Sequence, residues 1–162
     1  MLNGNGGADI LNGGGGRDQI NGGGGGGRDQ LIGGVGRDVL EGGGGRDQLN
    51  GAGGRDTLNG GGGRDQVSGG GGRDVLTDGR GVDELTGGGG ADVFQFQSGD
   101  RRDTITDFEQ GRDKIEIVEG VAAFEDHAIT QQGDDVLIAF SNVQVIVEDD
   151  NVAAFAADDF IF

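Results

Sequence analysis

An aspartate recurs every nine residues through the first 95 residues of this chain. It is the sixth residue of a unit whose first four positions are mostly glycine, as in Gly33–Glu41 (GGVGRDVLE). Carboxylates among glycine carbonyls are the hard oxygen ligands that calcium prefers. Stacked about 4.7–4.9 Å apart, they repel by roughly 1 kcal/mol per neighbour in water unless a cation lies between them. Ten units place this candidate ligand, at Asp9, Asp18, Asp29, Asp38, Asp47, Asp56, Asp65, Asp74, Asp83 and Asp92.

The rest of each unit predicts how these aspartates are positioned. The eighth position is always apolar, which predicts an inward-facing column of side chains. The series runs from Gly4 to Gln95, with a two-glycine insertion at Gly22–Gly23 and one degenerate unit, Asp78–Thr86 (DGRGVDELT). We expect the insertion to bulge one turn. We also expect the degenerate unit to be the one least able to bind a cation. The apolar column comprises Leu11, Ile20, Leu31, Leu40, Leu49, Leu58, Val67, Leu76, Leu85 and Phe94.

Composition excludes several classes of protein. The 162 residues include 41 glycines but no proline or cysteine, so collagen, disulfides and thiolate metal sites are ruled out. A net charge of −17 argues against nucleic acid and anionic membranes as partners. The single histidine, His127, cannot build a site that needs two. No apolar run approaches the roughly 20 residues that span a bilayer, and the start of the chain has no signal-peptide pattern.

The chain divides into two regions. Residues 1–95 hold 37 of the 41 glycines, whereas all eight phenylalanines lie from Phe94 onward. We therefore expect a repeat domain over 1–95 and a capping domain over 96–162, because the last coil of a solenoid exposes apolar surface. A short helix is predicted over Glu119–His127, and a hairpin turn at Gly133–Asp135. Strands are predicted at Val93–Gln97, Asp103–Phe108, Lys114–Val118, Val136–Phe140 and Val143–Val147.

The nonapeptide resembles the repeats-in-toxin (RTX) motif G-G-x-G-x-D-x-U-x of calcium-binding proteins. The resemblance implies an all-β fold, a right-handed parallel β-roll in which unit n stacks over unit n+2. It also implies that the first six residues of each unit form a turn and the last three a strand. Calcium would lie between stacked turns, held by the aspartates of position six and by glycine carbonyls.

The stacking predicts the number and strength of the sites. Ten turns stacked in two columns leave about eight gaps, so we expect about eight calcium ions in the roll. The apolar column is too thin to stabilise a fold alone, so residues 1–95 should be disordered without calcium. Because the repeat arginines oppose cations, the sites should be weak, on the order of 10⁻⁴–10⁻³ M, and they should fill cooperatively.

The stretch Ala91–Ile117 resembles the C-terminal domain of serralysin-type metalloproteases and the R-modules of alginate epimerases. By that resemblance Asp107 and Asp113 help to bind a further calcium ion in the cap; the alternative is that they are turn and strand-end aspartates. The terminal Asp158–Phe162 (DDFIF) is similar to the family's export signal. This implies bacterial type I secretion to the extracellular space, with the secretion apparatus as a partner. Phe160–Phe162 can also be the last strand of the cap.

Arginine at position five leaves two interpretations open. The side chains can point outward for solubility and pair with neighbouring acids, or they can form a cationic stripe that binds an acidic polysaccharide. Seven units carry this arginine, at Arg17, Arg28, Arg37, Arg46, Arg55, Arg64 and Arg73.

No catalytic motif accompanies the repeats. The chain has no H-E-x-x-H, no G-x-S-x-G and no P-loop. We therefore predict that it is not an enzyme but a calcium-binding module that folds after secretion. The alternatives are a binding module for an extracellular polysaccharide or cell-surface partner, and the C-terminal part of a larger secreted toxin, protease, lipase or epimerase.

Overall fold

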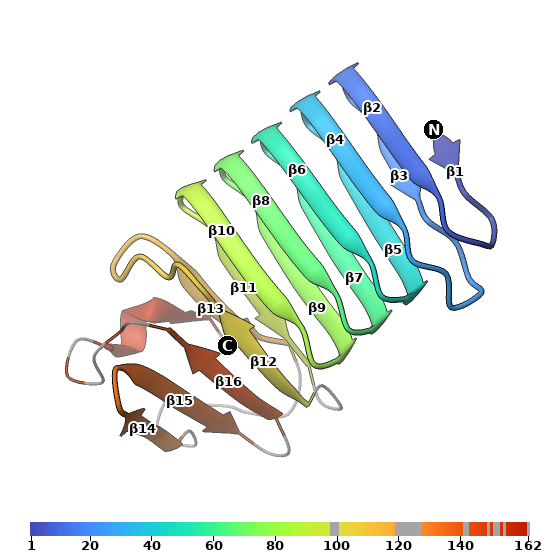
Figure 1. Cartoon of the computed structure of the whole chain (residues 1–162). Coiled ribbons are helices and arrows are strands. Elements are labelled where there is room, and N and C mark those ends of the chain that lie inside the picture. The colour runs from blue at the N-terminus through green and yellow to red at the C-terminus, as the bar shows by residue number, and fades with distance from the viewer. Residues whose placement is uncertain are drawn as a thin grey trace.

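In the computed structural model the chain forms an all-β parallel roll of two facing sheets (Figure 1). The structure describes residues 1–97, 101–118, 128–140, 143–148, 150, 153 and 155–161. One sheet runs in the order β1 (Leu2–Asn3), β3 (Gln19–Asn21), β5 (Val39–Gly45), β7 (Thr57–Gly63), β9 (Val75–Gly81), β11 (Val93–Phe96), β13 (Lys114–Ile117) and β17 (Phe160–Ile161). The other runs in the order β2 (Ile10–Gly16), β4 (Gln30–Gly36), β6 (Gln48–Gly54), β8 (Gln66–Gly72), β10 (Glu84–Gly90), β12 (Arg102–Ile105), β16 (Val143–Val147), β15 (Asp135–Phe140) and β14 (Ala128–Gln132).

The register confirms that each unit stacks over the unit two places further on. Leu31 pairs with Leu49 and Leu49 with Val67, so identical positions align 18 residues apart. The residues of position eight are buried between the two sheets from Ile20 onward, and they form one core with the C-terminal apolar residues. The nine-residue period therefore fixes both the register and the composition of the core.

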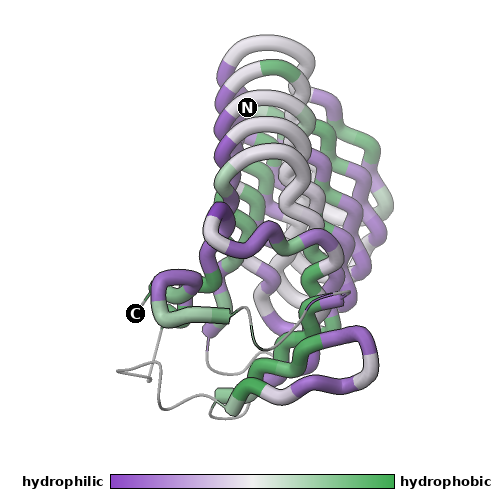
Figure 2. The backbone as a smooth tube through the Cα atoms, turned by 90° about the vertical axis from the view of Figure 1, so that its left-hand side faces the viewer, coloured by the Kyte–Doolittle hydropathy of each residue, from purple (hydrophilic) through white to green (hydrophobic). Residues whose placement is uncertain are grey.

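The extent of the strands differs from the expectation of a six-residue turn and a three-residue strand. Strands β4 to β10 each have seven residues, from position seven of one unit to position four of the next. Only two residues, such as Arg46 and Asp47, separate consecutive strands here. The glycine-rich segments do curve, as the nested pale arcs of Figure 2 show, but they stay hydrogen-bonded to the neighbouring coils while they do so.

The close approach of backbones explains this difference. Gly72 has φ +146°, and a Cβ atom there would lie 1.4 Å from the carbonyl oxygen of Gly54 in the neighbouring coil. A residue without a side chain can therefore curve and still pair with the next coil. The one non-glycine residue at a positive φ within the strands is Ala52, at φ +73°.

The two-glycine insertion bulges one turn, as the sequence predicted. Strand β3 ends at Asn21, and a bend at Gly24–Gly26 replaces the four further strand residues that other units have. The chain returns to the stack at Gly27, which forms an isolated bridge with Gly45.

The C-terminal strands continue the two stacks. Strand β11 pairs in parallel with β13, and β10 pairs with β12. The five predicted strands are present, with ends at most three residues from those expected. Strand β17 corresponds to the terminal cap strand offered for Phe160–Phe162, and β14 was not predicted. The predicted hairpin turn joins β14 to β15, with Gln132 opposite Asp135. The predicted helix at Glu119–His127 lies outside the described residues, and the division into domains at residue 95 stays a prediction.

Phenylalanines close the C-terminal end of the core. The rings of Phe94 and Phe108 lie 6.1 Å apart between centroids, and Phe108 stacks on Phe155 at 5.4 Å. Phe155 in turn meets Phe160 at 6.2 Å, after the short 3-10 helix η3 (Ala157–Asp159). Strand β17 pairs with β13, so Phe160–Ile161 is the last strand of that sheet.

Candidate calcium sites

The aspartates of position six form two continuous hydrogen-bonded columns. From Asp29 onward, the Oδ1 atom of each accepts the backbone N–H of the aspartate one coil earlier, as in Asp38 N to Asp56 Oδ1 (2.7 Å) and Asp56 N to Asp74 Oδ1 (2.8 Å). The same bond recurs from Asp9 to Asp92 at 2.7–2.9 Å. Positions five and six are the two residues that connect consecutive strands. Each aspartate therefore lies in the same short connection, and its carboxylate has the same orientation in every coil.

In eight of these carboxylates the second oxygen has no donor. The side chains from Asp29 to Asp92 are buried, at most 3% exposed. The Oδ2 atom of Asp56 and the carbonyl oxygen of Gly69 both lie 2.6 Å from the point where a Cβ on Gly51 would be. Two acceptors thus converge beside a residue that has no side chain. Eight aspartates have a buried Oδ2 atom without a hydrogen-bond partner, namely Asp9, Asp18, Asp38, Asp47, Asp56, Asp65, Asp74 and Asp92.

Burial makes the charged form of these groups costly. Desolvation raises the pKa of Asp65 to about 7, and it raises the pKa of Asp56 and of Asp92 to about 6. The neighbouring carboxylates of the column add to the rise, whereas the backbone hydrogen bond opposes it. A stack of buried carboxylates is therefore stable only when its charge is compensated, by protonation or by a bound cation.

The donor set fits a hard divalent cation. The groups that converge are carboxylate and carbonyl oxygens, and no nitrogen or sulfur ligand lies among them. Calcium takes six to eight oxygen ligands of this type, whereas zinc and copper favour histidine and cysteine.

A family model for the RTX calcium-binding nonapeptide repeat matches the chain in four copies, over residues 1–26, 24–58, 59–94 and 68–102. These matches cover more than half of the sequence. The chain belongs to this RTX repeat family. It is therefore a calcium-binding repeat module, as the resemblance of its nonapeptides implied.

Several solved structures are similar to this chain. The R2 subunit of the mannuronan C5-epimerase AlgE6 from Azotobacter vinelandii is 26% identical, with a TM-score of 0.53 over 79% of this chain and 91% of that one. The R3 subunit of the same enzyme is 25% identical (TM-score 0.48, 96% and 79% coverage). The extracellular lipase LipA from Serratia marcescens is 20% identical (TM-score 0.49), and the match covers 91% of this chain. The chain spans 38% of the lipase's length.

No curated protein sequence matches this RTX chain significantly. Among the described residues, the structure contains no helix long and apolar enough to cross a bilayer.

The two aspartates predicted to bind calcium in the cap have a different environment. Both oxygens of Asp107 accept backbone amides, from Gly87 (2.8 Å) and Gly88 (2.7 Å). The oxygens of Asp113 accept the amides of Asp92 and Glu109, each at 2.9 Å. Unlike the repeat aspartates, these two already have a donor at each oxygen, and their role as ligands stays a prediction.

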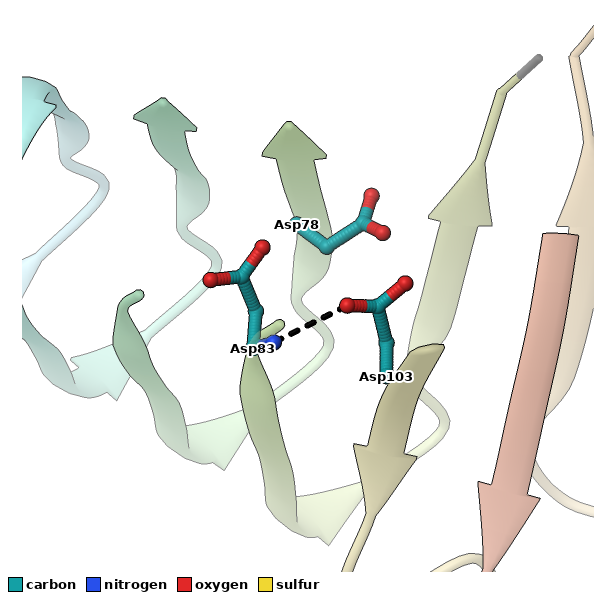
Figure 3. Close-up of side chains that lie close together, drawn as sticks. All are labelled: Asp78, Asp83 and Asp103. Atoms are coloured by element: carbon teal, nitrogen blue, oxygen red, sulfur yellow. Dashed lines mark hydrogen bonds between the residues drawn. The ribbon is translucent and has the colours of Figure 1, made fainter. Parts of the chain in front are cut away.

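The structure brings together three carboxylates that the sequence analysis did not group. One oxygen each of Asp78, Asp83 and Asp103 lies within 4.8 Å of the others (Figure 3). Asp103 extends the column beyond the repeats, since its Oδ1 accepts the amide of Asp83 at 2.9 Å. The only sequence signal was Asp78, which replaces the glycine at the first position of a unit. That replacement had been expected to weaken a calcium site.

The repeat arginines point outward, as one interpretation held, but they do not pair with acids. All seven are exposed, and within the described ranges none forms an ion pair or a side-chain hydrogen bond. By contrast, Arg112 of the C-terminal region forms an ion pair with Glu109. Arg28, Arg46 and Arg64 stand in consecutive coils and line a surface groove of about 240 Å³. The groove is also lined by four acidic residues, Asp47, Asp65, Asp83 and Glu84, so the arginines are not its only charges.

Proposed function

We propose that this chain is a non-catalytic calcium module that leaves a bacterial cell through type I secretion and folds in extracellular calcium. The observation that carries the proposal is the set of eight buried Oδ2 atoms without a donor. Burying that much uncompensated charge opposes folding, so the roll should not be stable until a cation is bound.

The ligands in this proposal are the aspartates of position six from Asp9 to Asp92, with carbonyl oxygens of the glycine-rich segments. The stacking supports about eight ions in the roll, because each gap between coils offers one repeated oxygen set. Bound calcium supplies positive charge and oxygen coordination, which turns repulsion between stacked carboxylates into attraction. Asp107 and Asp113 are the candidate ligands for one further ion in the cap.

The order of export and folding is supported by the C-terminal segment. The side chain of Asp159 is 2% exposed, and it accepts the amides of Gly111 and Ala156, each at 3.0 Å. Phe160 is buried beside it. Recognition of these residues by a secretion apparatus would therefore precede folding. A chain that stays unfolded in a cytosol with little calcium meets this requirement.

The non-catalytic role is supported by the sequence. It has no nucleophile or zinc motif, and His127 is its only histidine. The chain can also serve as the C-terminal part of a larger secreted toxin, protease, lipase or epimerase, in which another domain carries the chemistry.

The test is a calcium titration of the full chain followed by far-ultraviolet circular dichroism, with magnesium as the control ion. We expect a cooperative change from coil to β-structure in calcium only. Asp56→Asn removes one buried charge and should raise the calcium midpoint, whereas Asp134→Asn, in the exposed hairpin turn, should not. A chain that is fully β-structured in chelator, or coil in 10 mM calcium, contradicts the proposal. Export is tested by co-expression with a type I transporter, with and without residues 158–162.

A second function, binding of an acidic polysaccharide, is supported by the unpaired arginines. Arg28, Arg46 and Arg64 repeat at the coil spacing of about 4.7–4.9 Å, which suits a polymer with one carboxylate on each sugar. The R2 subunit with the similar fold belongs to an enzyme that acts on mannuronan.

Its test is the binding of a short oligouronate to the calcium-loaded chain at low and high salt. Arg46→Gln together with Arg64→Gln should weaken binding, and salt should weaken it further because the contacts are electrostatic. The matched control is Arg112→Gln, whose arginine lies outside the groove and pairs with Glu109. Equal binding by all three chains would exclude the groove as the site.

A further inference from the structure

The degenerate unit places a carboxylate at a position where the other repeat units have a glycine. Asp78 occupies the first position, next to its own position-six residue, Asp83. At the corresponding glycines, such as Gly51 and Gly69, a Cβ would lie 2.6–2.7 Å from a carboxylate oxygen and from a carbonyl oxygen of the next coil. A side chain at this position must therefore enter the layer of oxygens. Asp78 does so, with its side chain fully buried.

The three carboxylates converge from different strands. Asp78 lies on β9, Asp83 directly precedes β10 and Asp103 lies on β12 (Figure 3). Their exposed fractions are 0%, 3% and 0%, and one oxygen of each lies within 4.8 Å of the others. Backbone amides already take one oxygen of Asp83 (from Asp65, 2.7 Å) and one of Asp103 (from Asp83, 2.9 Å).

A separate observation concerns Asp65, which lies one coil before the degenerate unit. The Oδ2 atom of Asp65 is buried, has no hydrogen-bond partner and lies near the carbonyl oxygen of Asp78. These two oxygens lie 3.0 Å and 2.6 Å from one point beside Gly60. Asp65 itself is 1% exposed. One unpartnered oxygen of the preceding coil thus lies near the carbonyl oxygen of Asp78, while the Asp78 side chain lies close to two further carboxylates.

The position of the cluster gives it a structural consequence. Strands β8 and β10 share six register pairs, whereas β10 and β12 share only two. The cluster lies at the shorter pairing, between β10 and β12, where the nonapeptide repeats end. It also joins β9 of one sheet to β10 and β12 of the other.

We propose that Asp78, Asp83 and Asp103 form a three-carboxylate calcium site that binds more tightly than the consensus layers and fills first. The inference rests on the proposed calcium function and deepens it. Ligand charge is one of the quantities that set calcium affinity, and three carboxylates exceed the set of a consensus layer. Ion binding here fastens β12 to the last repeat coil, so the roll begins to fold from its C-terminal end.

The test is a calcium titration of the full chain in competition with a chromophoric chelator, with hydrogen exchange measured on β10 and β12. The variants are Asp78→Asn, which keeps the shape, and Asp78→Gly, which restores the consensus residue. The control is Asp134→Asn. We expect the first equivalent of calcium to bind about tenfold or more tightly than the rest, and both Asp78 variants to lose that difference. In the unaltered chain, one equivalent should protect β10 and β12 before β4 and β6.

Two results would overturn the inference while leaving the proposed function intact. One is a first equivalent that binds no more tightly than the rest. The other is an Asp78→Asn chain that titrates and exchanges like the unaltered protein. Failure of the proposed function itself looks different, because then no chain binds calcium or gains β-structure. Asp78→Gly keeps the comparison valid if the asparagine variant folds poorly, since glycine is the residue of the other units.

Discussion

The backbone amide of Asp56 donates to Oδ1 of Asp74 at 2.8 Å, one coil further along the roll. The same contact repeats along both columns, so the carboxylates from Asp29 onward hold the preceding coil with one oxygen, and our proposal assigns the other oxygen to the ion. This division explains why aspartate suits position six. Its side chain is short enough to reach the amide of the stacked residue while its second oxygen faces the glycine-rich layer.

Acid should stabilise the calcium-free roll. Burial raises the pKa of Asp56, Asp65 and Asp92 from 3.8 to about 6–7 in the folded chain, so the folded state binds more protons than the unfolded state. This contribution to stability is complete below about pH 4 and is lost as the pH rises through about 6–7. In chelator, β-structure measured by circular dichroism should therefore increase from pH 8 to pH 5.

Calcium should reverse this pH dependence. The ligands must be deprotonated to bind the ion, so protons compete with calcium. The calcium midpoint should rise as the pH falls from 8 to 5. Asp134→Asn, which removes an exposed carboxylate, serves as the control. A calcium-free chain that gains structure toward pH 8 would contradict the burial of these aspartates.

The period of nine was sufficient to single out the apolar column and the recurring aspartates, because a solenoid repeats one environment. The stacking and the role of the aspartates as ligands between stacked turns came from the resemblance to the RTX motif. The period was not sufficient for features that depend on contacts between coils. The length of the strands follows from the close approach of Gly72 to Gly54, which composition alone does not reveal. Asp78 departs from the consensus, and only its three-dimensional neighbours show that the substitution adds a carboxylate to a cluster instead of removing a glycine.

Alanine substitutions at two adjacent glycines should change the unfolding free energy in opposite directions. Gly72→Ala introduces a Cβ 1.4 Å from the carbonyl oxygen of Gly54 at φ +146°, and should cost more than about 2 kcal/mol of unfolding free energy. At Gly71 the nearest atom lies 3.9 Å away and φ is not positive, so Gly71→Ala should be neutral or stabilise by about 0.4–1 kcal/mol. Urea unfolding in saturating calcium measures both. Similar losses would mean that the coils are not stacked this closely.

The apolar column should contribute to stability even when calcium is bound. Leu58 is fully buried in the middle of the roll, and Leu58→Ala should lower the unfolding free energy by about 2–5 kcal/mol. Val35 is 75% exposed, so Val35→Ala should change it by less than about 0.5 kcal/mol. The comparison uses urea unfolding at a fixed calcium concentration. If both variants unfold at the same urea concentration, the ions alone hold the coils together.

Asp107 distinguishes a structural aspartate from a calcium ligand. Its two oxygens accept the amides of Gly87 and Gly88, which tie the segment after β12 to strand β10. Asp107→Asn keeps one acceptor and loses the other, so the chain should be destabilised by about 1–3 kcal/mol because one amide loses its charged partner. The number of calcium ions bound at saturation, measured by atomic absorption after dialysis, should stay the same.

The ion count decides between the two roles of Asp107. If the variant binds one ion fewer at saturation and its stability loss disappears in chelator, the carboxylate binds calcium, as the serralysin-like motif implied. If the count is unchanged and the loss persists at every calcium concentration at which the chain is folded, the amides of Gly87 and Gly88 are its partners in solution. Asp158→Asn, at an exposed carboxylate of η3, is the matched control and should change neither quantity.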